Sequence, residues 1–309
     1  MSYPPVTVLI PAYNATLTIE RALASAWRQN YPEMEVIVVD DGSSDDTDAR
    51  VQKHRSSNLR LLRLEKNRGV SSAMNAGIQE ARTEYIAFLD ADDEWLDNKL
   101  RTQLPIIEAR PEMSFISCGG HVVDLEGRVV GTFGLDPPSC PPHEFWRALL
   151  VKSRVAKPTV VARRAKLLEV GGFEESFKVS EDQDMWIKLA LSGEVGFVRE
   201  VLVRVHQTSG SLMKRYGARE DEFSLPMIRN HLSRLGSRLS KQEVQQILGE
   251  RFAATGRNIY YQGSLGRGAA LVIRGVLLGN RPLQNFAYLI SAAPPIIRLK
   301  ERFRGSRSK

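Results

Sequence analysis

Acidic side chains gather in short polar segments that each follow a run of apolar residues. In the clearest of these, at 90–93, Asp90 and Asp92 alternate along an extended stretch. Alternate residues of an extended chain point the same way, so both carboxylates can face one ligand. Two hard oxygen ligands, with water and phosphate in the remaining positions, suit Mg²⁺ or Mn²⁺ bound to a diphosphate. A solvated acidic turn is the alternative interpretation.

Two further polar segments follow apolar runs in the same manner. Residues 11–14 (Pro-Ala-Tyr-Asn) come after the run at 6–10, and residues 40–43 (Asp-Asp-Gly-Ser) come after the run at 35–39. The alternative for the second segment is a turn in which Asp41 or Ser43 caps the next helix. Three such segments at strand ends are less expected from turn formation alone, and they indicate a shared site.

The elements that must position these segments alternate along the first two hundred residues. Short β-branched runs predict strands, and apolar residues at helical spacing predict helices. The predicted strands lie at 6–10, 35–39, 59–64 and 85–89, and the predicted helices at 16–29, 45–54, 71–81 and 185–192. This alternation indicates an α/β fold with a parallel sheet covered on both faces. Such sheets bind ligands beyond the carboxyl ends of their strands, where the strand order switches.

The sequence changes character after about residue 215. Ser240 and Glu243 have the spacing of a capping box and predict a helix that begins at 241. Glycine and proline residues divide the shorter helices expected beyond it. We therefore predict an α/β domain over 1–215 and a helical, basic C-terminal region over 216–309.

Composition excludes disordered, collagen-like and disulfide-scaffold proteins, because 42% of the 309 residues are hydrophobic and 26% are charged. Cys118 and Cys140 lack metal-ligand spacing and are expected to be free thiols in a reducing compartment. We expect neither a signal peptide nor a membrane-spanning helix.

The net charge of +7 comes from the end of the chain, where residues 264–309 hold nine Lys or Arg against Glu301. Such a tail can attract anionic lipid or nucleic acid by charge alone. A solubilising end is the alternative interpretation.

Six segments, in this order, resemble family 2 of the inverting glycosyltransferases, which have the GT-A nucleotide-sugar fold. They lie at 11–14, 35–45, 67–77, 88–92, 171–186 and, more weakly, 204–209. The resemblance covers roughly residues 5–210, and its specificity comes from the ordered set rather than from any one motif. It implies a GT-A, Rossmann-like and mostly parallel sheet flanked by helices.

The resemblance also implies roles for residues that bind the donor nucleotide. Tyr13 and Asp41, with Asp40 beside it, would hold the base, and Pro11 and Ala12 would bring main-chain groups to the same pocket. The segment at 67–77 would lie along the ribose and diphosphate, and its implied contacts are Asn67, Gly69 and Asn75. The small residues of that segment fit a close approach of backbone to ligand. An ordinary loop and helix start is the alternative.

Acidic residues near the sugar and diphosphate would complete the site. Asp90 would reach a ribose hydroxyl, Asp92 would coordinate Mn²⁺ or Mg²⁺, and His206 would be a second metal or diphosphate contact. An ordinary hydrogen-bonded histidine is the alternative for His206. Trp95 and Trp186 line sugar subsites or pack in the core.

The resemblance places the catalytic base at Asp182, between Glu181 and Asp184. A carboxylate there would take the proton of the attacking acceptor hydroxyl. The three acids also suit the N-terminus of the helix predicted at 185–192, and the two roles are compatible.

The expected function is transfer of one sugar, with inversion, from a nucleotide-diphosphate donor, expected to be a UDP-sugar, to a hydroxyl of a glycan or lipid-linked acceptor. We expect a place in bacterial surface polysaccharide or cell-envelope glycan synthesis, in the cytoplasm or peripheral on the inner membrane face. Nucleic acid is not expected as a partner of such an enzyme. The alternative is a non-catalytic protein that binds an anionic membrane or nucleic acid through its basic tail.

Overall fold

The computed structural model describes residues 3–54, 56–137, 139–208 and 216–278. The chain divides into two compact units. The first, which we call the α/β unit, comprises Met1–Leu149 and Ser153–Ser211. The second, which we call the helical unit, comprises Leu150–Lys152 and Leu212–Lys309. The predicted boundary, at residue 215, lies close to the division that follows Ser211.

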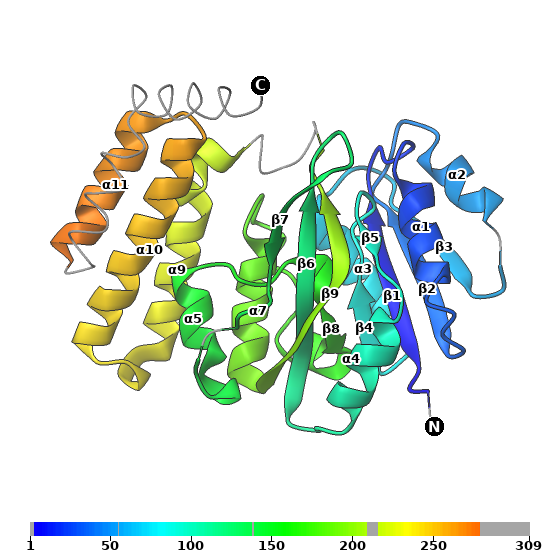
Figure 1. Ribbon diagram of the computed structural model, residues 1–309, viewed down its shortest axis with the longest axis horizontal. Helices are drawn as coiled ribbons and strands as arrows, with labels where there is room; N and C mark the ends of the chain where they lie inside the picture. The colour runs from blue at the N-terminus through cyan, green and yellow to red at the C-terminus, as the bar shows by residue number, and fades with distance from the viewer. Residues whose placement is uncertain (1–2, 55, 138, 209–215, 279–309) are drawn as a thin grey trace, which may run out of the picture. The chain divides into compact units, whose positions relative to one another are not determined.

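The α/β unit is built on one nine-stranded sheet with the order β3-β2-β1-β4-β8-β6-β9-β5, and β7 pairs with β6 (Figure 1). The strands are β1 (Val6–Ala12), β2 (Met34–Asp40), β3 (Leu59–Arg63), β4 (Tyr85–Phe88), β5 (Glu94–Trp95), β6 (Met113–Val123), β7 (Val129–Phe133), β8 (Val161–Arg163) and β9 (Glu194–His206). The first four strands pair in parallel, and β9 runs parallel to β6. The remaining pairs, which involve β5, β7 and β8, are antiparallel.

Helices connect the strands and cover both faces of the sheet. They are α1 (Ile19–Trp27), α2 (Thr47–Lys53), α3 (Val70–Glu80), α4 (Lys99–Glu108), α5 (Phe145–Val151), α6 (Arg164–Glu169) and α7 (Glu181–Ser192). Two 3₁₀ turns, η1 (Pro142–Glu144) and η2 (Lys157–Thr159), lie between β7 and β8. This is the predicted α/β fold class.

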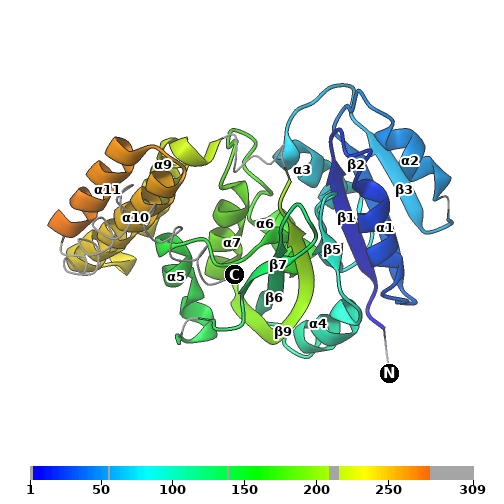
Figure 2. The same ribbon diagram turned by 45° about the horizontal axis from the view of Figure 1, so that its top comes forward.

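The two faces of the sheet are covered by different helices, which lie on opposite sides of it in Figures 1 and 2. Val8 and Ile10 of β1 belong to a buried cluster with residues of α1 and α4. Leu9 points the other way and packs against Gly77 of α3, where an added Cβ would lie 2.1 Å from a Leu9 methyl. On that same face Trp186 of α7 contacts the ring of Phe88 in β4. Alternate residues of a buried strand therefore pack into the core on opposite faces of the sheet.

The strand order switches direction at β1. From β1 the chain builds outward through β2 to β3, and then returns to place β4 on the other side of β1. A parallel sheet with such a switch opens a crevice between the carboxyl ends of the two strands beside it. The segments after β1 and β4 are those that carry Tyr13 and Asp90.

The first strand extends beyond its predicted end. We expected it to stop before Pro11, but β1 continues to Ala12 and pairs Pro11 with Val39 of β2. The pairing of β1 with β4 ends at Leu9 and Phe88. Pro11 therefore lies beyond the last residue of β1 that pairs with β4. Its missing N–H group breaks no hydrogen bond of that pairing.

Both tryptophans considered for sugar subsites lie in the core, with no exposed surface. The Trp95 indole N–H donates to the Pro158 carbonyl oxygen at 2.9 Å, and Trp186 packs among Phe88, Phe115 and Phe173. The core interpretation is therefore correct for both.

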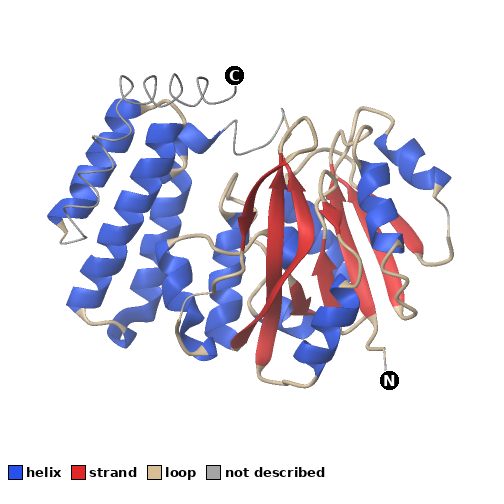
Figure 3. Ribbon diagram, viewed as in Figure 1, coloured by secondary structure: helices blue, strands red, loops and turns tan. Residues whose placement is uncertain are grey.

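The described part of the helical unit, 216–278, contains only helices and loops (Figure 3). Its elements are η3 (Gly217–Arg219), α9 (Asp221–Leu235), η4 (Gly236–Arg238), α10 (Lys241–Tyr261) and α11 (Leu265–Leu277). The capping box predicted at the start of α10 is present: Ser240 Oγ accepts from the Glu243 N–H, and the Glu243 carboxylate accepts from the Ser240 N–H. Across the described residues, no helix is long and apolar enough to span a membrane.

Candidate active site

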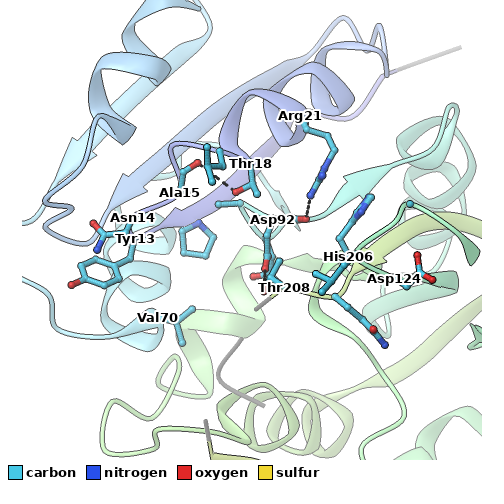
Figure 4. Close-up of a pocket in the computed structure, with 17 residues that line it drawn as sticks. Tyr13, Asn14, Ala15, Thr18, Arg21, Val70, Asp92, Asp124, His206 and Thr208 are labelled. Atoms are coloured by element: carbon cyan, nitrogen blue, oxygen red, sulfur yellow. Dashed lines mark hydrogen bonds between the residues drawn. The ribbon is translucent and has the colours of Figure 1, made fainter. Parts of the chain in front are cut away.

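A cavity of about 680 Å³ lies at the carboxyl ends of β1 and β4 (Figure 4). Its lining includes Pro11, Tyr13, Asp90, Asp92 and His206, all expected in the site from the sequence. The structure thus brings together residues from three distant segments at the switch point of the sheet. Tyr13 is half exposed there, which leaves its ring free to meet a ligand.

The two aspartates after β2 hold the neighbouring loops rather than line this cavity. Asp41 accepts the backbone N–H groups of Arg68 and Gly69, both at 2.8 Å. Asp40 is fully buried, and its Oδ1 accepts the Ser43 N–H at 2.9 Å. Burial raises the pKa of Asp41, and its hydrogen bonds from the backbone oppose that rise.

A close approach of two loops explains Gly42, which has a φ of +69°. A Cβ at this position would lie 2.7 Å from the backbone nitrogen of Asn67. Glycine is the residue that permits both the left-handed conformation and this contact. The Asp-Asp-Gly-Ser turn and the segment at 67–77 therefore meet, as a shared donor site would require.

Asn75 of the segment at 67–77 points to a different partner. Its Nδ2 donates to the Phe173 carbonyl oxygen at 2.9 Å, and its Oδ1 accepts the Phe173 N–H at 2.8 Å. Ser72 and Asn75 also donate to the carboxylate of Glu175. These bonds tie α3 to the turn that precedes α7, and a donor contact by Asn75 stays a prediction.

Asp90 and Asp92 have separate partners in the cavity wall. Asp90 Oδ1 lies 2.9 Å from the ammonium of Lys157, and Thr208 donates to Asp92 Oδ2 at 3.3 Å. Arg21 of α1 donates to the backbone carbonyl oxygen of Asp92. Burial raises the pKa of Asp92, and the nearby charge of Asp90 raises it further.

His206 and Asp92 line the same cavity but point in different directions. Figure 4 shows the imidazole turned toward Arg21 and the Asp92 carboxylate turned toward Thr208. Nε2 of His206 lies 3.5 Å from a Glu94 carboxylate oxygen, and Asp93 accepts the His206 backbone N–H at 2.9 Å. Burial lowers the pKa of His206, and the charge of Arg21 lowers it further.

The acids around Asp182 form the first turn of α7, where negative charge is favoured. Asp184 pairs with Lys188 at 2.6 Å within the helix. Glu181 is buried, and its Oε1 lies 3.9 Å from Lys157 Nζ. Burial and the charge of Asp182 raise the pKa of Glu181 to about 7, and Lys157 opposes that rise. Asp182 lies outside the cavity lining, and Lys157 links its neighbour Glu181 to Asp90.

A divalent cation fits the chemistry of the cavity. Asp92 supplies a partly buried carboxylate whose pKa is raised by burial and by the charge of Asp90, so a bound cation would relieve like-charge repulsion. Among the residues that the structure describes, no group of three or more His, Cys, Asp or Glu could hold a metal by itself. The Asp92 carboxylate suits a Mg²⁺-type site, in which one or two carboxylates act with substrate phosphates and water.

Sequence reasoning missed four residues of this region: Arg21, Asp93, Lys157 and Thr208. Each contacts a predicted site residue or its backbone. Asp93 adjoins the Asp-x-Asp segment and could have been included on that ground. Thr208 lies in the weaker matching segment at 204–209, two residues after His206, and could have been included on that ground. Arg21 and Lys157 carry no signal, because they lie in segments without a motif and meet the site only through the fold.

Comparison with solved structures identifies the fold. TarS 1–349 of S. aureus aligns with a TM-score of 0.61 and 22% identity, and the match covers 98% of this chain and 92% of that chain. The mannosyltransferase PcManGT from Pyrobaculum calidifontis, solved with GDP-Man and Mn²⁺, aligns with a TM-score of 0.61 and 21% identity over 96% of this chain and 88% of that chain. The α/β unit therefore has the expected GT-A fold.

Sequence comparison then gives the family. Residues 7–133 match the model of glycosyl transferase family 2. WfaP of Escherichia coli, a UDP-Glc:alpha-D-GlcNAc-diphosphoundecaprenol beta-1,3-glucosyltransferase, is 30% identical over 190 residues, which are 61% of this chain and 71% of that protein. An uncharacterized glycosyltransferase of Rickettsia prowazekii is 29% identical over 227 residues, 72% of this chain and 71% of that protein. The chain belongs to glycosyl transferase family 2 and is a glycosyltransferase.

Proposed function

We propose that this glycosyltransferase moves a sugar from a UDP-sugar to a hydroxyl of a lipid-linked or other glycan acceptor, with inversion at the anomeric carbon. The observation that carries the proposal is the cavity at the switch of strand order, which Tyr13, Asp90 and Asp92 line together. The relatives WfaP and WfgD of Escherichia coli carry names that describe transfer from UDP-Glc to a diphosphoundecaprenol-linked GlcNAc. We infer a role in bacterial surface polysaccharide or cell-envelope glycan synthesis.

The nucleotide would bind at the ends of β1 and β2. Tyr13 offers an exposed ring face to the base, and Asp41 would accept from a uracil N–H while its bonds to the backbone of 68–69 keep it in place. Pro11, Ala12 and Asp40 would complete the base pocket, with Asn67, Gly69 and Asn75 along the ribose and diphosphate. Asp90 would accept from a ribose hydroxyl.

Asp92 would hold Mn²⁺ or Mg²⁺ against the diphosphate, with His206 as a second contact once its ring turns from Glu94 toward the cavity. When bound, the cation neutralises charge that grows on the leaving nucleotide diphosphate. Asp92 supplies the fixed carboxylate for it, and Arg21 holds the Asp92 backbone by its hydrogen bond to the carbonyl oxygen.

Asp182 would act as the general base. The acceptor oxygen forms a bond to the anomeric carbon as the bond from that carbon to the diphosphate oxygen breaks, and the acceptor proton passes to the carboxylate. One displacement of this kind inverts the anomeric configuration. Burial raises the pKa of Asp182, and the charge of Lys157 and the position in the first turn of α7 oppose that rise.

The test compares Asp182→Asn with wild type in a transfer assay that contains each UDP-sugar, Mn²⁺ and a GlcNAc-diphospho-lipid. We expect transfer to fall by about 10²–10⁴-fold with donor binding retained, since only proton removal is lost. Glu174→Gln is the matched control, because within the described part of the chain that exposed carboxylate accepts hydrogen bonds from Ser176 in the nearby loop. Transfer by Asp182→Asn at the wild-type rate would contradict the assignment of the base.

The stereochemistry is tested on the product of the same assay. NMR of the new linkage should show a β-glycoside from an α-linked donor. An α-glycoside would contradict inversion. Complete absence of transfer and of nucleotide binding would instead favour the alternative of a non-catalytic protein that acts through its basic tail.

We place the reaction in the cytoplasm, at the inner face of an anionic membrane. The support is the basic composition of 264–309 and the lipid-linked acceptors in the names of WfaP and WfgD. Most of that segment, 279–309, lies outside the described residues. Nucleic acid is not part of this proposal.

A further inference from the structure

Lys157 is a buried cation that joins two parts of the site. Its side chain is 10% exposed, and Nζ lies 2.9 Å from Asp90 Oδ1 and 3.9 Å from Glu181 Oε1. Asp90 follows β4 in the cavity wall, and Glu181 begins α7 next to Asp182. One ammonium therefore spans the segment proposed to bind the donor and the segment proposed to carry the base.

The backbone that carries Lys157 is fixed by core hydrogen bonds. The Pro158 carbonyl oxygen accepts from the Trp95 indole N–H at 2.9 Å, and the Thr159 carbonyl oxygen accepts from Gln103 at 2.9 Å. The Thr159 hydroxyl also bonds to Ser117 at 2.8 Å. The turn η2 is thus attached to β6, α4 and the β5 segment, and it presents the lysine from a rigid support.

The charges around Lys157 depend on one another. Burial alone would lower the pKa of Lys157, but Asp90, Glu181 and Asp182 outweigh it and raise that pKa. Burial raises the pKa of both Glu181 and Asp182, and Lys157 opposes the rise at each. The other charge that faces both acids is the like charge of Asp90.

We propose, on the basis of the function proposed above, that Lys157 is a positioning residue. It holds Asp90 and the Glu181–Asp182 turn in one arrangement, through its ammonium 2.9 Å from Asp90 Oδ1 and 3.9 Å from Glu181 Oε1. Lys157 acts through these carboxylates and does not touch the reacting atoms. Without its charge, the carboxylates of Glu181 and Asp182 would lie close together with no ammonium beside them, and a proton would bind to one of them instead.

The first test measures the transfer reaction of Lys157→Met and Lys157→Arg across pH 5–9. Methionine keeps the length and burial of the side chain and removes only the charge. We expect Lys157→Met to lose about 10²-fold in kcat at pH 7, as for loss of a general base, with a smaller change in the donor KM. The acid limb of its kcat profile should move to higher pH, because Asp182 then ionises later. Lys157→Arg should recover most of kcat and the wild-type profile.

An unchanged pH profile and kcat in Lys157→Met would overturn the proposal. A second result would also overturn it: Lys157→Met loses kcat, its pH profile stays unchanged, and Lys157→Arg does not recover kcat. A structural defect alone would give that result.

The second test needs no activity and separates this proposal from the proposed function. The melting temperature of Lys157→Met should fall below that of wild type by more at pH 8 than at pH 5, because the carboxylates take up protons as the pH falls. Lys166→Met is the control, since Lys166 pairs with Glu169 on the surface of α6, and its effect should not vary with pH. A deficit in Lys157→Met that is the same at both pH values would overturn the proposal.

Should Lys157→Met fail to fold at neutral pH, the double variant Lys157→Met/Glu181→Gln tests the same charges. It removes one of the carboxylates left unpaired, so it should melt at a higher temperature than Lys157→Met or accumulate as folded protein where the single variant does not. A double variant no more stable than the single one would overturn the proposal. Wild type without any transfer activity, combined with the expected pH dependence of melting, would reject only the proposed function.

Discussion

Lys99, in the first turn of α4, is a lysine with no exposed surface. Its ammonium lies 4.3 Å from the centre of the Trp95 ring, and among the described residues Nζ has no hydrogen-bond partner. Burial lowers the pKa of Lys99 to about 8, and Cys118 opposes that shift. A charged amine in this place costs stability that a hydrophobic side chain of similar length would not.

We therefore expect Lys99→Met to stabilise the protein by about 1–3 kcal/mol at pH 7. The gain should shrink as the pH rises from 8 to 10.5. In that window the folded Lys99 has lost its proton and the unfolded one still binds it, so wild-type stability rises with pH. Melting temperatures at pH 7 and pH 10 check this, with exposed Lys53→Met as the control. A variant less stable than wild type at pH 7 would contradict it.

At the scale of single residues, the sequence predicted the side chains that carry their own signal. Tyr13, Asp90 and Asp92 follow apolar runs, and the structure places all three on one cavity. Lys157 and Arg21 could not be predicted, because each lies more than sixty residues away in sequence from the Asp-x-Asp residue that it contacts. Only the packing of η2 and α1 against that segment brings them there.

At the scale of elements, the contact of α3 with β1 depends on Gly77. A Cβ there would lie 2.1 Å from a Leu9 methyl, and Leu9 is fully buried. Alanine would improve helix propensity by about 1 kcal/mol, but the overpacking costs about 1–3 kcal/mol or more. The clash outweighs the gain at so short a distance.

We expect Gly77→Ala to destabilise the α/β unit and to weaken nucleotide binding, because α3 begins beside the cavity. Gly131→Ala is the control, since a Cβ there would meet its nearest neighbour at 3.8 Å, an ordinary contact. Urea denaturation of both variants measures the difference. Equal stability of Gly77→Ala and wild type would show that α3 and β1 are packed less closely than described.

The parallel half of the sheet was predictable because its strands are short, continuous apolar runs between amphipathic helices. The predictions for β1 to β4 differ from the structure by a few residues at their ends. The other half was not predicted, because β6 pairs with β8 and β9 from later parts of the chain, and pairing between distant segments leaves no local pattern. Prediction of the parallel half of the sheet was therefore better than prediction of the mixed half.

At the scale of the whole molecule, the basic end of the chain begins in the helical unit. Arg267 of α11 pairs with Asp221 and Glu222 of α9, and Arg274 lies over the ring of Phe252. These two arginines therefore belong to the packing of the unit. The other seven basic residues lie within 281–309, which is the part left for a membrane surface.

A variant that ends at Leu278 tests the proposed membrane contact and keeps α11 intact. We expect the full chain to bind vesicles that contain anionic phospholipid, with about 1 kcal/mol per basic residue near the surface, and to release them as salt rises. The shortened variant should not bind them, and its melting temperature and response to UDP should match the full chain. Neutral vesicles serve as the control. Equal binding of anionic vesicles by both forms would contradict the proposal.

The central claim is that the cavity at the ends of β1 and β4 binds a nucleotide diphosphate through Asp92 and a divalent cation. The most direct measurement is the melting temperature of wild type and Asp92→Ala with UDP, GDP, dTDP or CMP, each with and without Mn²⁺. A ligand at a hundred times its dissociation constant adds about 2.7 kcal/mol, a rise of several degrees for a chain of this size. We expect that rise for UDP in wild type, only with Mn²⁺, and none in Asp92→Ala. No rise with any nucleotide, or an equal rise in Asp92→Ala, would contradict the account.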